Sequence, residues 1–301
     1  MTRHAVNVLL AYNHYAVSSG RYMTDAFQRI GHDTWHIGPP KGRDIWSMRV
    51  PEHYVHAPDR VDGSDDPYRL PERPFDLAVV MDTASAMLDL PDKLGLKALR
   101  APIVVYGVDN HVCSYRRPWF DHYFLAHHDG PVQPVRLDDE SWLPCAYDPA
   151  WYMPSATPFG EREYDVAMIG FMYPLRRELV RLLEAEGWRV LAGTGLLFDQ
   201  YADAYQNARI SLCISAAGDV AQRVFETAAM GCHVLSDPCA DFERLEARGI
   251  AVCPPEQMIA RVNELLSSND AERAIAESLE WATPHTWDER ARHIAAWAEK
   301  R

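Results

Sequence analysis

The 301-residue sequence has no run of 18 uninterrupted apolar residues, which argues against a transmembrane helix. Its first residues lack the basic region, the apolar stretch and the small-residue cleavage site of a secretory signal. The six cysteines form no CxxC pair, and most of them lie inside apolar runs. Buried, reduced thiols are typical of cytoplasmic proteins, so we expect a cytoplasmic protein with no membrane span.

Positive charge is scarce, because 30 Lys+Arg stand against 43 Asp+Glu and give a formal net charge of −13. This balance argues against a general nucleic-acid binder, although a local basic groove is compatible with it. The hydrophobic fraction of 48% is typical of a globular protein. Ten of the 13 histidines precede residue 150. We interpret them as scattered surface imidazoles, and a His-rich site is the alternative.

Several motifs that decide function by themselves are missing. The sequence contains no GxxxxGK[ST], HExxH, GxSxG or GxGxxG motif. Its acidic clusters at 65–66 and 138–140 are typical of solvated charge runs rather than of a metal-binding DxD loop. Gly193 and Gly195 follow a predicted strand, but a tight turn explains that pair as well as a phosphate loop does. We therefore expect no bound metal.

Short apolar runs alternate with helical patterns along the chain, which predicts an α/β protein with parallel sheets. Four prolines between residues 144 and 158 indicate a linker. The predicted domains are 1–150 and 151–285, followed by a C-terminal helix over 286–301. Predicted strands lie at 6–11, 34–37, 77–81, 103–106 and 122–126, and then at 166–169, 189–192, 210–214, 234–236 and 250–253. Predicted helices lie near 22–30 and at 176–187, 222–230, 242–248, 256–266, 271–281 and 287–300.

Polar residues follow several strands of the first predicted domain. His14 follows the first strand, Asp82 follows the strand at 77–81, and Asp109 and His111 follow the strand at 103–106. Ligands of open parallel sheets bind at the carboxyl ends of strands, so these four residues are site candidates. The alternative is that they cap the next helix.

The most informative stretch is 222–231, which opens a helix after a buried strand and a loop of small residues. Free N–H groups and the helix dipole make such a position an anion site. Arg223 lies in the first turn, where a cation is disfavoured unless it grips a bound diphosphate. Glu226, one turn later, carries a carboxylate that can accept both vicinal hydroxyls of a ribose. The alternative is an Arg–Glu pair on a solvated helix face.

Five segments in a fixed order resemble the C-terminal domain of group 1 glycosyltransferases, especially the spore-maturation CgeB-like branch. The resemblance covers residues 142–293 well and the first half only in general layout. The matching segments are WLPCAYDP at 142–149, DVAMIG at 165–170, PLRREL at 174–179, RVFE with AAMG at 223–231, and HTWDERA at 285–291.

The resemblance implies a GT-B architecture: two Rossmann-like domains facing each other across a cleft, with the C-terminal helix crossing back to the first domain. It also implies an enzyme, a hexosyltransferase that uses a nucleotide-sugar donor, most simply a UDP-sugar. By position, Glu226 holds the donor ribose and Arg223 the diphosphate. The remaining predicted donor-binding residues are Arg176, Arg177, Gly170, Gly195 and Asp219. Many group 1 enzymes carry a further glutamate eight residues before the ribose one; here Gly218 stands there, and the adjacent Asp219 is the candidate substitute.

Transfer from such a donor requires stabilisation of the departing diphosphate, which GT-B enzymes achieve without an obligatory metal. An inverting enzyme also needs a base, for which Asp109, His111, Asp82 and His14 are the candidates. A retaining enzyme needs none, and the sequence does not distinguish the two outcomes.

The acceptor stays open among a small molecule, a glycan, a protein and hydroxymethylated DNA. The irregular segment 41–74 interleaves basic and aromatic residues that could hold a polyanion, but its acidic residues are as frequent, which favours a solvated loop. The alternative to an enzyme is a catalytically silent nucleotide-sugar-binding module.

Overall fold

The computed structural model describes residues 5–40, 44–45, 48–62, 64, 66, 68–82, 89–215 and 217–301. The chain forms two compact units, which are Met1–Pro144 with Trp287–Arg301, and Cys145–Thr286. The final helix α9 (Trp287–Ala298) therefore belongs to the first unit. The predicted domain boundary at residue 150 lies inside the second unit. Within the described ranges, no helix is long and apolar enough to cross a membrane.

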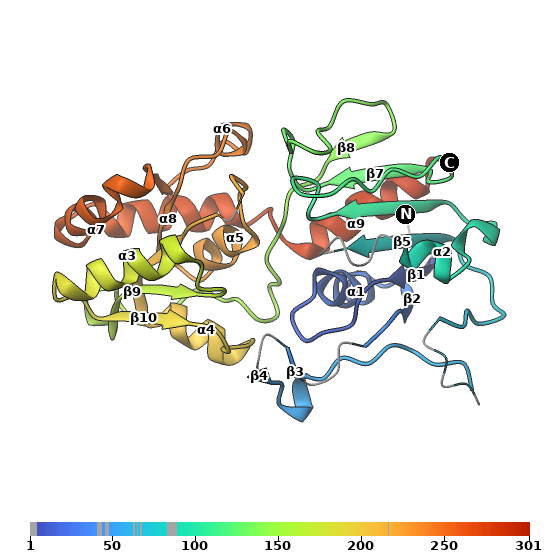
Figure 1. Cartoon of the computed structure of the whole chain (residues 1–301), viewed down its shortest axis with the longest axis horizontal. Coiled ribbons are helices and arrows are strands. Elements are labelled where there is room, and N and C mark those ends of the chain that lie inside the picture. The colour runs from blue at the N-terminus through green and yellow to red at the C-terminus, as the bar shows by residue number, and fades with distance from the viewer. Residues whose placement is uncertain are drawn as a thin grey trace. The chain divides into compact units, whose positions relative to one another are not determined.

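The first unit is built on a six-stranded parallel sheet with the order β2-β1-β5-β6-β7-β8 (Figure 1). Continuous apolar runs form its central strands because both faces of a parallel sheet are covered. The strand order reverses between β1 and β5, which pair directly. The strands are β1 (Asn7–Ala11), β2 (Asp33–Ile37), β5 (Leu77–Asp82), β6 (Ile103–Gly107), β7 (His122–Leu125) and β8 (Glu140–Trp142).

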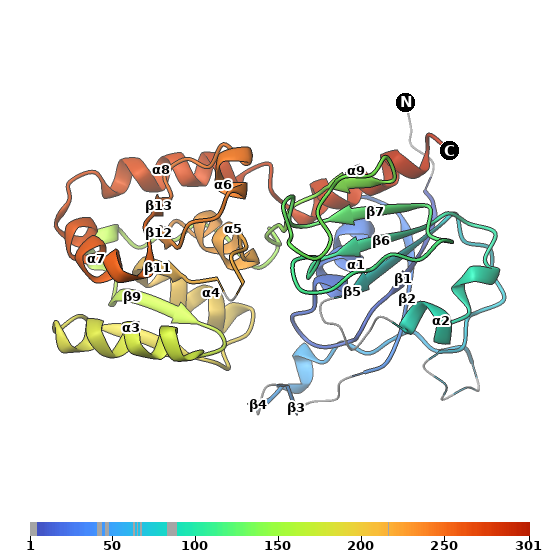
Figure 2. The ribbon, with the colours of Figure 1, turned by 45° about the horizontal axis from the view of Figure 1, so that its top comes forward.

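Helix α1 (Ser19–Arg29) begins after Ser18, whose hydroxyl accepts the Arg21 N–H at 3.1 Å. It packs against α9 (Figures 1 and 2). The Trp287 side chain of α9 is fully buried, with its ring centroid 5.6 Å from that of Tyr106. These contacts hold the chain's last helix on the first unit.

The second unit contains a five-stranded parallel sheet with the order β10-β9-β11-β12-β13. Its strand order reverses between β9 and β11, which are neighbours. Helices α3 and α8 lie on opposite faces of this sheet (Figure 2). The strands are β9 (Tyr164–Ile169), β10 (Val190–Gly193), β11 (Ala208–Cys213), β12 (His233–Ser236) and β13 (Ala251–Val252). The helices are α3 (Pro174–Ala185), α4 (Asp199–Gln206), α5 (Gln222–Ala229), α6 (Asp241–Arg244), α7 (Met258–Ser267) and α8 (Ala271–Ala282).

The structure departs from the sequence prediction mainly in short elements. Four features were not predicted from the sequence: α4, the four-residue helix α2 (Leu90–Lys93), the three-residue strand β8 and the hairpin of β3 (Asp44–Ile45) with β4 (Met48–Arg49). Helix α6 ends at Arg244 rather than at 248. Elements this short give little periodicity, so contacts with neighbouring segments decide them. Of the basic and aromatic residues in the irregular segment, Lys41, Arg43 and Trp46 lie outside the described residues.

Candidate donor site

The loops that follow β9 and β11 bring the predicted donor residues together. Gly170 directly follows β9, and α5 begins at Gln222 after the loop that leaves β11. Because the strand order reverses between these two strands, their carboxyl ends frame the crevice where α/β sheets bind ligands. The first turn of α5 has no side-chain cap, and in the part of the chain that the structure describes only its Val224 N–H donates to a backbone carbonyl, that of Ala221 at 2.9 Å. The Gln222 and Arg223 N–H groups are therefore available to an anion.

Arg223 lies directly over Gly170. A Cβ atom at Gly170 would lie 2.2 Å from Arg223 Nη2 and 3.9 Å from Arg176 Nη1. Gly170 also has φ +142°, so only glycine suits this position on both counts. The glycine thus lets two guanidinium groups, from α5 and α3, approach the end of β9.

The two arginines carry positive charge that no carboxylate in the described structure neutralises directly. Arg223 Nε and Nη1 are buried without a hydrogen-bond partner among the described residues. Arg176 Nη1 donates to the Phe171 carbonyl at 2.8 Å, and its Nη2 donates to the Ile214 carbonyl. Burial, and then repulsion from Arg223, lower the pKa of Arg176. This is the electrostatic signature of an anion site.

Arg177 behaves differently from its neighbour. Its side chain is exposed on α3, whereas Arg176 is only 6% exposed. Of the two arginines predicted at this step, the structure places Arg176 next to Arg223 and turns Arg177 to solvent.

Glu226 is buried, and two hydrogen bonds hold its carboxylate. Its Oε2 accepts the Tyr201 hydroxyl at 2.8 Å, and its Oε1 accepts Gln222 Nε2 at 2.6 Å. Burial raises the pKa of Glu226. Glu226 is only 6% exposed, so the alternative of an Arg–Glu pair on a solvated helix face is wrong. Each carboxylate oxygen keeps a lone pair for a further donor.

Asp219 is held in the loop between β11 and α5. Its Oδ1 accepts the Ser215 hydroxyl at 2.7 Å, and the Ser215 backbone N–H donates to Asp237 Oδ1 at 2.8 Å. Gly218, with φ +76°, occupies the position where many group 1 enzymes carry glutamate. A side chain at that position would be strained, so the loop favours the carboxylate one residue later.

Gly195 lies in the loop after β10, next to β9 in the sheet. It has φ +113°, and Gly193 two residues earlier accepts the Gly170 N–H at 2.7 Å. Both glycine loops therefore meet at the same edge of the second sheet.

The two residues that orient Glu226 were not predicted from the sequence. Tyr201 lies on the unpredicted helix α4, and Gln222 is the first residue of α5. Gln222 and Glu226 are four residues apart on a helix, which is a detectable signal. The contribution of Tyr201, 25 residues away, carries no such signal.

The first unit holds the four candidate bases. Asp82 ends β5, and its side chain is not among those described. Asp109 and His111 lie in the turn after β6, where the Asp109 N–H donates to the Tyr115 hydroxyl at 3.0 Å. His14 follows β1 and is 1% exposed. Burial, with repulsion from two neighbouring imidazoles, lowers the pKa of His14 to about 2, which makes it a weak base.

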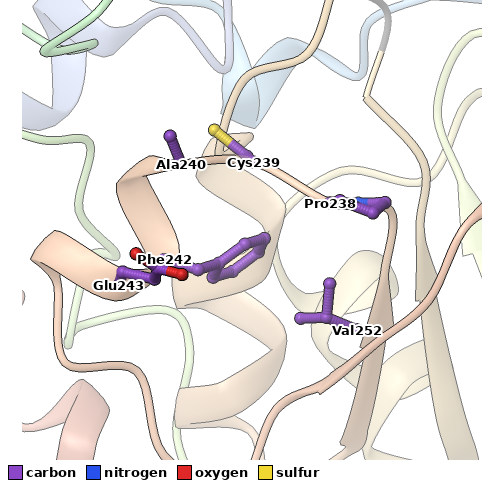
Figure 3. Close-up of a pocket in the computed structure, with 6 residues that line it drawn as sticks. All are labelled: Pro238, Cys239, Ala240, Phe242, Glu243 and Val252. Carbon is purple, nitrogen blue, oxygen red and sulfur yellow. The ribbon is translucent and has the colours of Figure 1, made fainter.

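A pocket of about 450 Å³ lies at the carboxyl end of β12 (Figure 3). None of the predicted site residues lines it. Its walls come from α6, β13 and the segment between β12 and α6: Pro238, Cys239, Ala240, Phe242, Glu243 and Val252.

Comparisons with known proteins show which fold this chain shares. Residues 168–296 match the model of the glycosyl transferase-like family. The chain also aligns over almost its whole length with GT-B glycosyltransferase structures. The fold is GT-B. No curated protein sequence matches the chain.

Three solved structures show the extent of the GT-B likeness. Sucrose-phosphate synthase from Thermosynechococcus elongatus aligns with a TM-score of 0.63 at 10% identity, covering 98% of each chain. An alpha-glucosyltransferase with UDP and DNA containing a HMU base gives 0.65 at 11%, covering 99% of this chain and 100% of the other. Anabaena HepE with UDP-glucose gives 0.65 at 10%, covering 96% and 99%. Identities this low mean that the fold is shared while most side chains differ.

Proposed function

We propose that this protein is a nucleotide-sugar-dependent glycosyltransferase and that its second unit binds a UDP-sugar. The observation that carries the proposal is the pair Arg223 and Arg176 over Gly170, with the buried Glu226 one helical turn further on. The pair suits a diphosphate, and the carboxylate suits the two hydroxyls of a ribose. Structural neighbours that hold UDP and UDP-glucose support this choice of donor.

The chemistry that these residues support is stabilisation of the leaving group. As the glycosidic bond to the diphosphate breaks, negative charge grows on the phosphate oxygens. Arg223, Arg176 and the N–H groups of the first turn of α5 are already oriented, so they stabilise that charge with little reorganisation. The Tyr201 and Gln222 hydrogen bonds hold Glu226 in place before the ribose arrives.

The first unit is proposed to bind the acceptor. Asp109 and His111 follow β6, and Asp82 ends β5, so these residues remain the candidate bases of an inverting reaction. The low pKa of His14 disfavours it in that role. Asp219 is proposed to contact the donor sugar in place of the glutamate that Gly218 replaces.

Transfer is proposed to need no Mg²⁺ or Mn²⁺, because guanidinium groups supply the charge at the diphosphate. The test is turnover after EDTA treatment, with each metal then added back. Unchanged turnover agrees with the proposal, and loss of turnover that Mg²⁺ or Mn²⁺ restores contradicts it.

A panel of UDP-, GDP-, ADP- and TDP-sugars, screened by thermal shift on the full chain, tests the donor assignment. A ligand that binds the folded state raises the melting temperature by mass action. We expect UDP-sugars to raise the melting temperature of the wild type and of Arg177→Gln by the same amount. Glu226→Ala and Arg223→Ala should lose this rise. Equal stabilisation of all variants contradicts the site.

Two further candidate functions are separated by product analysis. The alpha-glucosyltransferase whose structure contains DNA with a HMU base favours a DNA acceptor as the second candidate. Radiolabelled glucose from UDP-glucose, offered to DNA with and without hydroxymethyluracil, tests it. A silent binding module would bind the donor but would neither transfer nor slowly hydrolyse it.

The order of the five motifs along the chain further supports placing the protein in the spore-maturation CgeB-like branch. The product analysis identifies the acceptor, and the acceptor is what further tests the placement in this branch.

A further inference from the structure

Three histidines that are far apart in the sequence meet in the first unit. His14 follows β1, His36 lies in β2, and His56 lies in the connection between β4 and β5. One ring nitrogen of each lies within 4.8 Å of the others. These residues are buried or half-buried, so the interpretation of the histidines as scattered surface imidazoles is wrong for them. His36 lies 22 residues after His14, and His56 lies 20 residues after His36, so no local sequence motif predicts the cluster.

The spacing of the three rings fits a shared metal ion. A ring nitrogen lies about 2.0–2.1 Å from zinc, which puts tetrahedral ligand nitrogens about 3.3 Å apart and their ring centroids about 5 Å apart. The His14–His36 centroids are 5.2 Å apart, His14–His56 5.3 Å and His36–His56 4.7 Å. His14 Nε2 and His36 Nδ1 are 3.0 Å apart. The rings thus need only small shifts to converge on one ion.

His36 also has the outer partner that metal-binding histidines usually have. Its Nδ1 faces His14, while its Nε2 lies 3.6 Å from Asp59 Oδ2. The same carboxylate oxygen accepts the His36 backbone N–H at 2.8 Å, so Asp59 is fixed in place. A carboxylate behind a ligating imidazole sets its tautomer and orients its ring.

The remaining ring is oriented from the side of α1. His56 Nε2 and the Tyr12 hydroxyl are 2.5 Å apart, and Thr24 Oγ1 donates to that hydroxyl at 3.1 Å. Neutral imidazoles offer the lone pairs that zinc, copper and nickel prefer, whereas Mg²⁺ and Mn²⁺ prefer carboxylates.

We propose that His14, His36 and His56 bind one divalent transition-metal ion, with zinc as the best fit. Three protein ligands leave a fourth position for water or for an oxygen of a bound molecule. The ion ties the β4–β5 connection to the ends of β1 and β2, beside the point where the strand order of the first sheet reverses. This site is separate from the donor residues of the second unit and does not depend on the proposed function.

The test starts from the full-length wild-type protein, stripped with EDTA and then titrated with ZnCl₂ alone. We expect one Zn²⁺ per chain and a rise in melting temperature on loading. X-ray absorption at the zinc edge should show three imidazole nitrogens. The Co²⁺-loaded protein should show the visible absorption of a four-coordinate site. Absence of stoichiometric binding, or a ligand set without three nitrogens, overturns the proposal without any need for a variant.

Matched variants then locate the ion. His36→Gln and His56→Gln should each weaken Zn²⁺ binding at least about 10-fold, and Asp59→Asn should weaken it about 10–100-fold. His53→Gln, at an exposed histidine three residues from His56, should leave the affinity unchanged. Circular dichroism checks that each variant is folded. Wild-type affinity in both folded ligand variants overturns the assignment. UDP-sugars should raise the melting temperature equally in the wild type and in all of these histidine and Asp59 variants. Failure of the proposed donor site is therefore distinguishable from failure of the metal site.

Discussion

Replacing Arg223 with glutamine should make the ligand-free protein more stable and its donor binding weaker. Arg223 Nη2 and Arg176 Nη1 lie 2.2 and 3.9 Å from one point above Gly170, so they are at most 6.1 Å apart. Two unit charges at that distance repel each other by about 3 kcal/mol at an effective dielectric constant of about 20. Arg223→Gln removes this repulsion and a buried guanidinium whose Nε and Nη1 have no partner in the described structure.

The same substitution removes charge-assisted hydrogen bonds to the diphosphate. Such bonds contribute about 1.5–3 kcal/mol, so the Kd for UDP should rise about 10- to 150-fold. Urea unfolding measures the stability, with an expected gain of up to about 3 kcal/mol. Isothermal titration with UDP measures the affinity.

Two further variants separate charge from geometry. Arg223→Lys keeps the repulsion but loses the planar fork, so it should weaken UDP binding without the gain in stability. Arg177→Gln, on the exposed face of α3, should change neither quantity. A folded Arg223→Gln protein that binds UDP as tightly as wild type would refute the reasoning, and so would a loss of stability in the absence of UDP.

Three other substitutions probe separate parts of the chain. Glu226→Gln keeps the shape but not the charge of the ribose-binding group, so UDP should bind about 10-fold less tightly. Because burial raises the pKa of Glu226, its ionised form costs stability above that pKa. Unchanged UDP affinity together with a lower melting temperature would assign Glu226 a structural role. Trp287→Ala should lower stability by about 3–5 kcal/mol, because the ring is fully buried in the first unit; a calorimetric melting temperature within one degree of wild type, on the order of the measurement error, would contradict this. Burial lowers the pKa of His233 to about 4, so the unfolded chain binds the proton first as pH falls below about 6.5. His233 alone should therefore contribute a loss of up to about 3 kcal/mol between pH 6.5 and 4, and His233→Asn should lose less stability than wild type over that range in urea titrations.

The sequence by itself determined the parts of this protein that depend on local order along the chain. Apolar runs and helical periodicity predicted the main strands of both sheets, because a strand covered on both faces must be apolar throughout. Arg223 and Glu226 were predicted because a helix start and one helical turn are short-range relations, whereas Gly170 came from the resemblance. The return of the last helix to the first unit came from the resemblance.

Tertiary structure decided what depends on contacts between distant segments. Only the fold showed that Arg176 lies next to Arg223 while Arg177 faces solvent, since both lie in the first turn of α3. Tyr201 reaches Glu226 from a helix that the sequence did not reveal. His14, His36 and His56 meet because β1 and β2 are parallel neighbours and the long connection returns to their ends, and pairing between strands leaves no periodic trace in a single sequence.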